Sequence, residues 1–184
     1  MSEARILLWR DLPDPLAALP AIDKIFFAAS NTRQFANDAA KAQFRERWLG
    51  RYLTHDPDHV LIAQTENGSI TGYLVGSFDD PAQTSRFADI GYFAALAPVT
   101  ARYPAHLHVN LDANARSHGT GSSLVLAFAD RARRAGMPGV HVVTGKGARN
   151  AVFYQRLGFL ERVVFPWHGV DLVLLGHDLT SIGH

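Results

Sequence analysis

A glycine-containing loop in front of a helix constrains the fold more than any other feature of this chain. The stretch "NARSHGTGSSLVLAFADRARRAG", residues 114–136, follows the alternating run "HLHVNL", residues 106–111. Its apolar residues recur at helical spacing and stop at Gly136, which is typical of a helix end. A helix N-terminus presents unpaired backbone N–H groups, and glycines let a bulky anion approach them without meeting a Cβ. The stretch therefore predicts a phosphate-binding loop between a strand and a helix.

The rest of the chain predicts a mixed α/β fold around this loop. The expected elements are a strand at 5–10, a helical pair within 21–53, a hairpin at 59–78 turning at Asn67-Gly68, an insertion at 79–104 with a short helix over 88–96, the strand 106–111, the long helix, a strand at 140–144, a short helix at 150–157, and two closing strands around Pro166. This order contains one parallel strand–helix–strand crossover. We expect a mixed central sheet flanked by helices, in a single domain over residues 1–184.

Composition excludes several classes of function. With 18 Lys and Arg against 17 Asp and Glu, the net charge of +1 gives no bulk attraction to nucleic acid or to an anionic membrane, so neither is an expected partner. The chain has no cysteine, which excludes disulfides, a thiolate nucleophile and a cysteine-based zinc site, and a cytoplasmic location is the expectation. The apolar run near the N-terminus is too short for a signal peptide or a membrane span.

The glycine loop does not match the two commonest phosphate-binding motifs. A P-loop requires Gly-Lys-Ser/Thr after its spacer, but Gly121 is followed by Ser122. A dinucleotide fingerprint would need a third glycine where Leu124 stands. What remains is R-x-x-G-x-G, from Arg116 to Gly121, and its alternative interpretation is a tight turn beside a surface arginine.

This element, together with "FYQRLGF" at residues 153–159, resembles the GCN5-related N-acetyltransferase (GNAT) superfamily. In that superfamily the first motif binds the pyrophosphate of coenzyme A, so the resemblance implies acetyl-CoA as cosubstrate, no metal, and an amine acceptor that the sequence does not identify. More narrowly, "YPAHLHVNL" and "DLVLLGHDL" resemble the acetyltransferase-like domain of O-GlcNAcases and its free-standing bacterial relatives. Cofactor binding and acetyl transfer are separate claims in that group. A catalytically inactive acetyl-CoA-binding or interaction module is therefore the alternative.

The resemblance also implies a set of cofactor-binding residues. These are Leu111, Arg116, Ser117, His118, Gly119, Thr120, Gly121, Ser122, Asn150 and Tyr154. Asn150 lies a turn later than the usual coenzyme-contacting asparagine of the superfamily, whose position is Gly147, and capping of the short helix is its other role. Tyr154 matches the superfamily's general acid near the coenzyme sulfur, and a packed aromatic residue is the alternative.

The general base departs from the superfamily pattern, because the strand before the loop lacks the usual glutamate. His108, or His106 beside it on the same face, is the candidate substitute, since imidazole titrates near neutral pH. A structural histidine is the alternative at either position. His106, His108 and His141 also permit a metal cluster, although no carboxylate partner accompanies them in sequence. Trp167 and the segment around Tyr92 and Phe93 are candidates to line the acceptor pocket.

Overall fold

The computed structural model describes residues 4–116 and 119–180 and divides into two units. Unit 1 comprises Met1–Gly76 and His108–Phe128, and unit 2 comprises Ser77–Leu107 and Ala129–His184. Strand β4 (Ala105–Leu111) and helix α5 (Thr120–Arg134) contribute residues to both. The hydrogen-bonded strand order is β1-β2-β3-β4-β5-β7-β6, which confirms the expected mixed α/β sheet.

Unit 1 is built on an antiparallel meander. Strand β1 (Arg5–Leu8) pairs with β2 (Leu61–Gln64), and β2 pairs with β3 (Ile70–Ser77). Gly68 has φ +86° in the β2–β3 turn, so the predicted hairpin is confirmed. The first strand is shorter than expected, because the chain turns into the 3₁₀ helix η1 (Trp9–Asp11) before the prolines.

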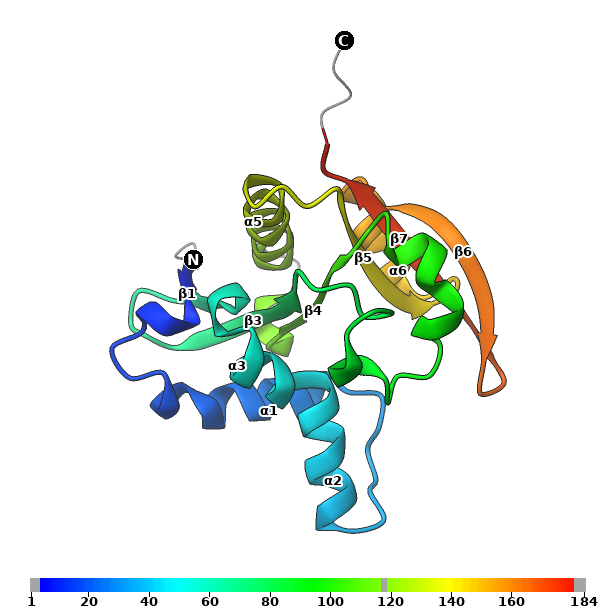
Figure 1. Ribbon diagram of the computed structural model, residues 1–184. Coiled ribbons are helices and arrows are strands. Elements are labelled where there is room, and N and C mark those ends of the chain that lie inside the picture. The colour runs from blue at the N-terminus through cyan, green and yellow to red at the C-terminus, as the bar shows by residue number, and fades with distance from the viewer. Residues whose placement is uncertain (1–3, 117–118, 181–184) are drawn as a thin grey trace. The chain divides into compact units, whose positions relative to one another are not determined.

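The predicted helical pair of unit 1 is confirmed, and Figure 1 shows α1 and α3 below the strands of this unit. The first helix is α1 (Leu19–Ala29), preceded by η2 (Leu16–Ala18). The second runs through α2 (Asp38–Arg45), the π-helical turn η3 (Glu46–Gly50) and α3 (Arg51–His55), and is followed by η4 (Pro57–His59). Ile22, Leu49, Tyr52, Ile62 and Leu74 are fully buried, so the helices and strands of unit 1 share one apolar core.

Unit 2 contains the parallel pairing of β4 with β5 and a closing hairpin. The first half of β4 pairs in parallel with β5 (Gly139–Gly145), and β5 and β6 (Leu160–Trp167) both pair antiparallel with β7 (Val170–Asp178). Helix α6 (Arg149–Arg156) contacts β5 and β7. Pro166 lies within β6 rather than between two strands, and this is tolerated because β6 is an edge strand.

The insertion before β4 differs from the sequence prediction. It forms η5 (Ser85–Phe87), η6 (Phe93–Leu96) and α4 (Ala97–Thr100), so the short helix expected over 88–96 is wrong. Pro98 lies in the first turn of α4 instead of following a helix. Proline is suited to that position, because its missing N–H has no partner there and its φ is already helical.

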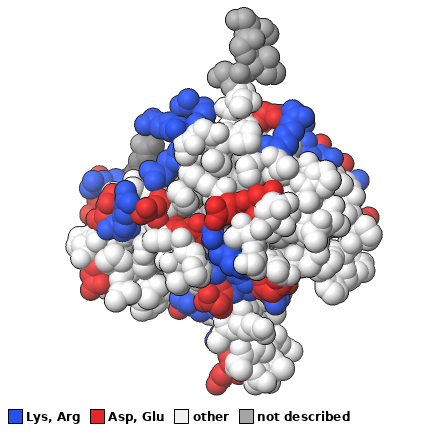
Figure 2. Space-filling view, in the orientation of Figure 1, with Lys and Arg blue, Asp and Glu red and all other residues white. Residues whose placement is uncertain are grey.

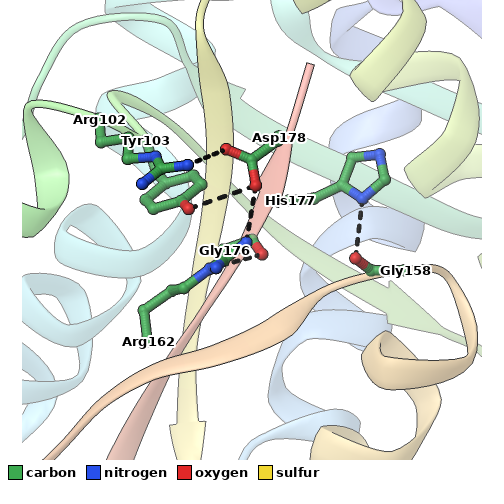
Figure 3. A network of polar contacts seen from close by, with 7 residues as sticks. All are labelled: Arg102, Tyr103, Gly158, Arg162, Gly176, His177 and Asp178. Atoms are coloured by element: carbon green, nitrogen blue, oxygen red, sulfur yellow. Dashed lines mark hydrogen bonds and ion pairs between the residues drawn. The ribbon is translucent and has the colours of Figure 1, made fainter. Parts of the chain in front are cut away.

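A polar network anchors the start of β4 within unit 2 (Figure 3). The guanidinium groups of Arg102 and Arg162 lie 5.6 and 4.9 Å from the ring centroid of Tyr103. Both also bond the carboxylate of Asp178, at 3.1 and 2.7 Å. A Cβ at Gly139 would lie 2.4 Å from Cδ1 of Tyr103. Glycine at 139 therefore lets the ring of Tyr103 lie directly against β5.

The surface agrees with the balanced composition. Acidic and basic side chains are interspersed on the face drawn in Figure 2. Within residues 4–116 and 119–180, no helix is long and apolar enough to cross a membrane.

Candidate functional site

The strand that leads into the glycine loop ends as the sequence predicts. Leu111 is the last residue of β4, and the backbone N–H of Asp112 donates to the carbonyl of Thr71 at 2.9 Å. Asp112 then caps the short helix η7 (Ala113–Ala115) by accepting from the N–H of Asn114 at 2.9 Å. Arg116 follows in an extended conformation, with its side chain exposed. The loop thus begins with an arginine available to an anion.

The other side of the loop is the N-terminus of α5. Gly119 has φ +81°, and a Cβ built there would have nothing within 4 Å. Helix α5 starts at Thr120, and the first backbone N–H groups of a helix have no intrahelical acceptor. Gly121 is buried and Ser122 half-buried behind the exposed Gly119. A glycine with open space at its Cβ position, next to the first N–H groups of a helix, suits the approach of a pyrophosphate.

Two of the expected cofactor residues, Ser117 and His118, lie outside the described residues. Asn150 is exposed in the first turn of α6, but the helix cap is Ala148 and has no side-chain cap bond. The capping role considered for Asn150 is therefore wrong. Its cofactor contact stays a prediction.

Tyr154 lies in unit 2 on α6, where it is 7% exposed. Its ring contacts Phe153 and Phe159, with centroids 5.0 and 5.5 Å away. Burial raises the pKa of the Tyr154 hydroxyl above its ordinary value, because the phenolate would lose its hydration. The phenol is thus protonated at neutral pH, as a proton donor must be. Gly158, in the same motif, has φ +86°, which allows the tight turn from α6 into β6.

His108 is half-buried on β4 in unit 1, and the structure gives it a partner that the sequence analysis missed. The hydroxyl oxygen of Tyr52 lies 3.2 Å from Nε2 of His108. The rings of Trp48 and Tyr52 stand edge-on to the imidazole, with centroids 5.4 and 5.5 Å away. The fourfold spacing of Trp48 and Tyr52 showed that they share a helix face, but not which strand residue that face meets.

His106 does not share an accessible polar face with His108, so that expectation is wrong. It is 3% exposed in unit 2, and its ring lies 4.8 Å from that of Phe87. His106 pairs with His141 in the β4–β5 register, and their rings stack at 5.5 Å. Burial thus makes His106 a core residue, in line with the structural alternative.

His141 is also a core residue, 1% exposed, and its Nδ1 lies 2.5 Å from the carbonyl oxygen of Tyr103. Burial lowers its pKa to about 4, because an imidazolium there would lose its hydration. Within the described ranges 4–116 and 119–180, no group of three or more His, Cys, Asp or Glu side chains is placed to hold a metal ion.

Two of the candidate acceptor-pocket residues meet in unit 2. The rings of Tyr92 and Trp167 are 5.2 Å apart and nearly perpendicular, at 89°. Phe93 contacts Tyr92 at 4.7 Å and also faces His141 at 5.8 Å. The insertion and strand β6 therefore share an aromatic cluster. Whether it contacts an acceptor stays a prediction.

The fold is that of an acetyltransferase. The model of the acetyltransferase (GNAT) family matches residues 22–159, and the chain belongs to this family. Three solved structures have a similar fold. SsHAT has a TM-score of 0.73 at 20% identity, covering 97% of this chain and 100% of its own. An N-acetyltransferase from Staphylococcus aureus Mu50 has a TM-score of 0.65 at 19% identity, covering 97% and 100%.

The third is yncA, a putative acetyltransferase from Salmonella typhimurium, whose structure contains its cofactor acetyl-CoA. Its TM-score is 0.63 at 20% identity, covering 100% of this chain and 98% of yncA. No curated protein matches the chain.

Proposed function

We propose that this protein is an N-acetyltransferase that moves an acetyl group from acetyl-CoA to an amine, with residues 1–184 forming one catalytic domain. The observation that carries the proposal is the loop at the start of α5, where Gly119 has φ +81° and open space in front of it. Arg116, Gly119, Thr120, Gly121 and Ser122 would hold the pyrophosphate through backbone N–H groups, hydroxyls and one guanidinium. When bound, acetyl-CoA supplies an activated acetyl thioester.

His108 and Tyr154 would handle the two protons of the transfer. The amine nitrogen forms a bond to the acetyl carbon while the carbon–sulfur bond breaks. His108 accepts the proton that the amine loses, and Tyr154 donates a proton to the departing sulfur. The burial that raises the pKa of Tyr154 keeps this proton in place until sulfur carries negative charge. Tyr154 would act in the protonated form that its raised pKa maintains near neutral pH.

A non-catalytic acetyl-CoA-binding module is the second candidate. The observation in its favour is the strand "RYPAHLHVN", which lacks the carboxylate that superfamily members use as base. A module of this kind would hold the cofactor through the backbone of the loop without deprotonating an amine. The O-GlcNAcase-like resemblance and the cytoplasmic location stay predictions.

Two measurements on the full chain test the proposal. Acetyl-CoA is expected to raise the melting temperature while free adenosine raises it far less, since the loop would bind the pyrophosphate. Equal shifts, or none, would remove the cofactor assignment. Coenzyme A release is then followed with polyamines, amino sugars, aminoglycosides and lysine peptides. Release with one class identifies the acceptor chemistry, whereas binding without release with any of them supports the non-catalytic module.

A further inference from the structure

We propose that His177 is a positioning residue that fixes the ring of Tyr154 by donating a hydrogen bond from Nδ1 to the carbonyl of Gly158. The inference rests on the proposed function, in which Tyr154 is the general acid. It adds the residue that holds this acid in place. All three residues belong to unit 2.

His177 lies on strand β7 and reaches the turn that follows α6. Its Nδ1 lies 3.0 Å from the carbonyl oxygen of Gly158, and Figure 3 shows the imidazole pointing at this oxygen. A Cβ at Gly158 would lie 3.1 Å from both Nδ1 and Cε1 of His177, so a glycine at 158 lets the imidazole lie close to the turn. The imidazole also stacks on the ring of Phe159, with centroids 5.2 Å apart and an interplanar angle of 28°. His177 therefore contacts two consecutive residues of the turn.

The direction of this hydrogen bond follows from the chemistry of its acceptor. A backbone carbonyl oxygen can only accept, so Nδ1 of His177 carries the proton. The neutral Nδ1–H tautomer and the imidazolium both meet this requirement, since each has a donor at Nδ1. A neutral ring with its proton on Nε2 is the one state in which the bond cannot form. The position of the ring proton is therefore a direct test of the contact.

The same turn holds Tyr154 through its backbone and through its ring. The N–H groups of Leu157 and Phe159 donate to the carbonyl of Tyr154 at 2.9 and 3.1 Å. The ring of Phe159 is fully buried, and its centroid lies 5.5 Å from that of Tyr154. Movement of the turn would move both the end of α6 and the ring that packs against Tyr154. Because the bond from His177 restricts the turn, it also restricts the position of the Tyr154 phenol.

Proton transfer to the departing sulfur depends on where this phenol is held. A general acid acts within hydrogen-bond reach of the atom that it protonates, and a misplacement of about 1 Å can lower the rate ~100-fold. Loosening the turn after α6 would leave the residues of the glycine loop at the start of α5 unchanged. The inference therefore predicts a loss of kcat without a matching loss of acetyl-CoA affinity.

Three substitutions separate the hydrogen bond from ring packing and from stability. His177→Phe retains an aromatic ring next to Phe159 but removes the donor. His177→Asn removes the ring but places an amide nitrogen the same number of bonds from Cα as Nδ1, so a donor is retained. His141→Phe is the matched control, because Nδ1 of His141 also faces a backbone carbonyl oxygen in unit 2, that of Tyr103, at 2.5 Å. The acceptor of that bond lies outside the turn after α6.

The test combines spectra, thermal melting and kinetics on the full chain. ¹⁵N-histidine labelling reports which ring nitrogen of His177 carries the proton, and ¹³C-tyrosine labelling reports the ring of Tyr154, with His177→Asn and Tyr154→Phe assigning the signals. We expect a proton on Nδ1 of His177 in the wild type. The Tyr154 signals are expected to shift or broaden in His177→Phe and to stay unchanged in His177→Asn and His141→Phe.

The kinetic expectation follows the same division. In His177→Phe, kcat is expected to fall roughly 10-fold or more, as for a lost hydrogen bond, while KM for acetyl-CoA stays within about twofold. His177→Asn and His141→Phe are expected to retain kcat within about threefold. Melting temperatures show whether His177→Phe and His141→Phe lose stability, so a loss of kcat that follows stability alone is recognised.

The outcomes separate this inference from the proposed function. A wild-type His177 with its proton on Nε2 alone overturns the inference even when the protein transfers acetyl groups. Tyr154 signals that move only in His177→Phe support the positioning role, and an absence of turnover in the wild type would then count against the proposed function alone. Unchanged Tyr154 signals or an unchanged kcat in His177→Phe overturn the inference, as do equal losses of kcat in His177→Phe and His141→Phe. If His177→Phe does not fold, the Tyr154 signals of His177→Asn decide, since unchanged signals support the donor role and shifted signals overturn it.

Discussion

Replacing Gly119 with alanine separates the conformational role of this glycine from its proposed role in cofactor binding. Gly119 and Gly136 flank helix α5 with nearly identical φ values, +81° and +80°. A Cβ at either position would have nothing within 4 Å. Each alanine therefore costs only the left-handed backbone penalty, about 1 kcal/mol. For a chain of this size that corresponds to a fall in melting temperature of roughly 2–4 °C.

The two variants are expected to differ in acetyl-CoA binding. The methyl group of Gly119→Ala would enter the space proposed for the pyrophosphate and reduce affinity about tenfold or more, which is at least ~1.4 kcal/mol. Gly136→Ala adds the same group at the other end of the helix and is expected to bind normally. Isothermal titration calorimetry on both variants, with thermal melting in parallel, provides the comparison. Equal affinities for the two variants would refute the placement of the cofactor at this loop.

Three further predictions concern Tyr154, the glycines of β5 and His141. Tyr154→Phe should retain acetyl-CoA affinity but lower kcat roughly 100-fold, measured by calorimetry and coenzyme A release, and an unchanged kcat would remove its role as acid. Gly139→Ala should lower the melting temperature by about 4–8 °C, because its Cβ would lie 2.8 Å from the backbone oxygen of Arg102. The control Gly145→Ala, whose Cβ would make only a 3.6 Å contact, should shift it far less, and similar shifts would contradict this packing argument. His141 has a folded pKa of about 4 against an ordinary 6.5, so the unfolded chain binds the extra proton, and the free energy of unfolding should fall as pH drops from 6.5 to 4. Denaturant unfolding should show that the free energy of unfolding of His141→Leu falls by about 3 kcal/mol less than that of the wild type over this pH range. Parallel pH profiles for wild type and variant would exclude a buried neutral histidine.

The features that the sequence predicted correctly depend on local signals. The β2–β3 hairpin follows from the Asn67-Gly68 turn. Gly68 has φ +86°, which few residues other than glycine adopt readily. The glycine loop and α5 follow from an apolar stripe with glycines at both ends. In each case the residues that determine the structure lie close together in the sequence. The fold class follows from the order of such elements.

The errors concern residues whose environment comes from distant parts of the chain. Alternation along β4 places His106 and His108 on the same side of the strand, and that much can be read from the sequence. In unit 2, however, His106 meets the rings of Phe87 and His141, whereas in unit 1 His108 meets Tyr52. The prediction of a helix in the insertion is wrong for a related reason. Short 3₁₀ turns place Phe87 and Phe93 against buried rings, and such turns leave no periodic apolar stripe in the sequence.

The contact between Tyr52 and His108 involves a π-helical turn that the fourfold spacing of the aromatic residues does not reveal. Residues four apart on an ideal α-helix drift by about 40° per step, so the directions of Phe44 and Tyr52 would differ by about 80°. The π-helical turn η3, closed by a bond from the N–H of Arg51 to the carbonyl of Glu46, rotates less per residue and reverses part of that drift. Trp48 and Tyr52 can then both face His108, as their ring distances of 5.4 and 5.5 Å show. The π turn thus changes the direction in which Tyr52 points, and the hydroxyl of Tyr52 lies 3.2 Å from Nε2 of the proposed base.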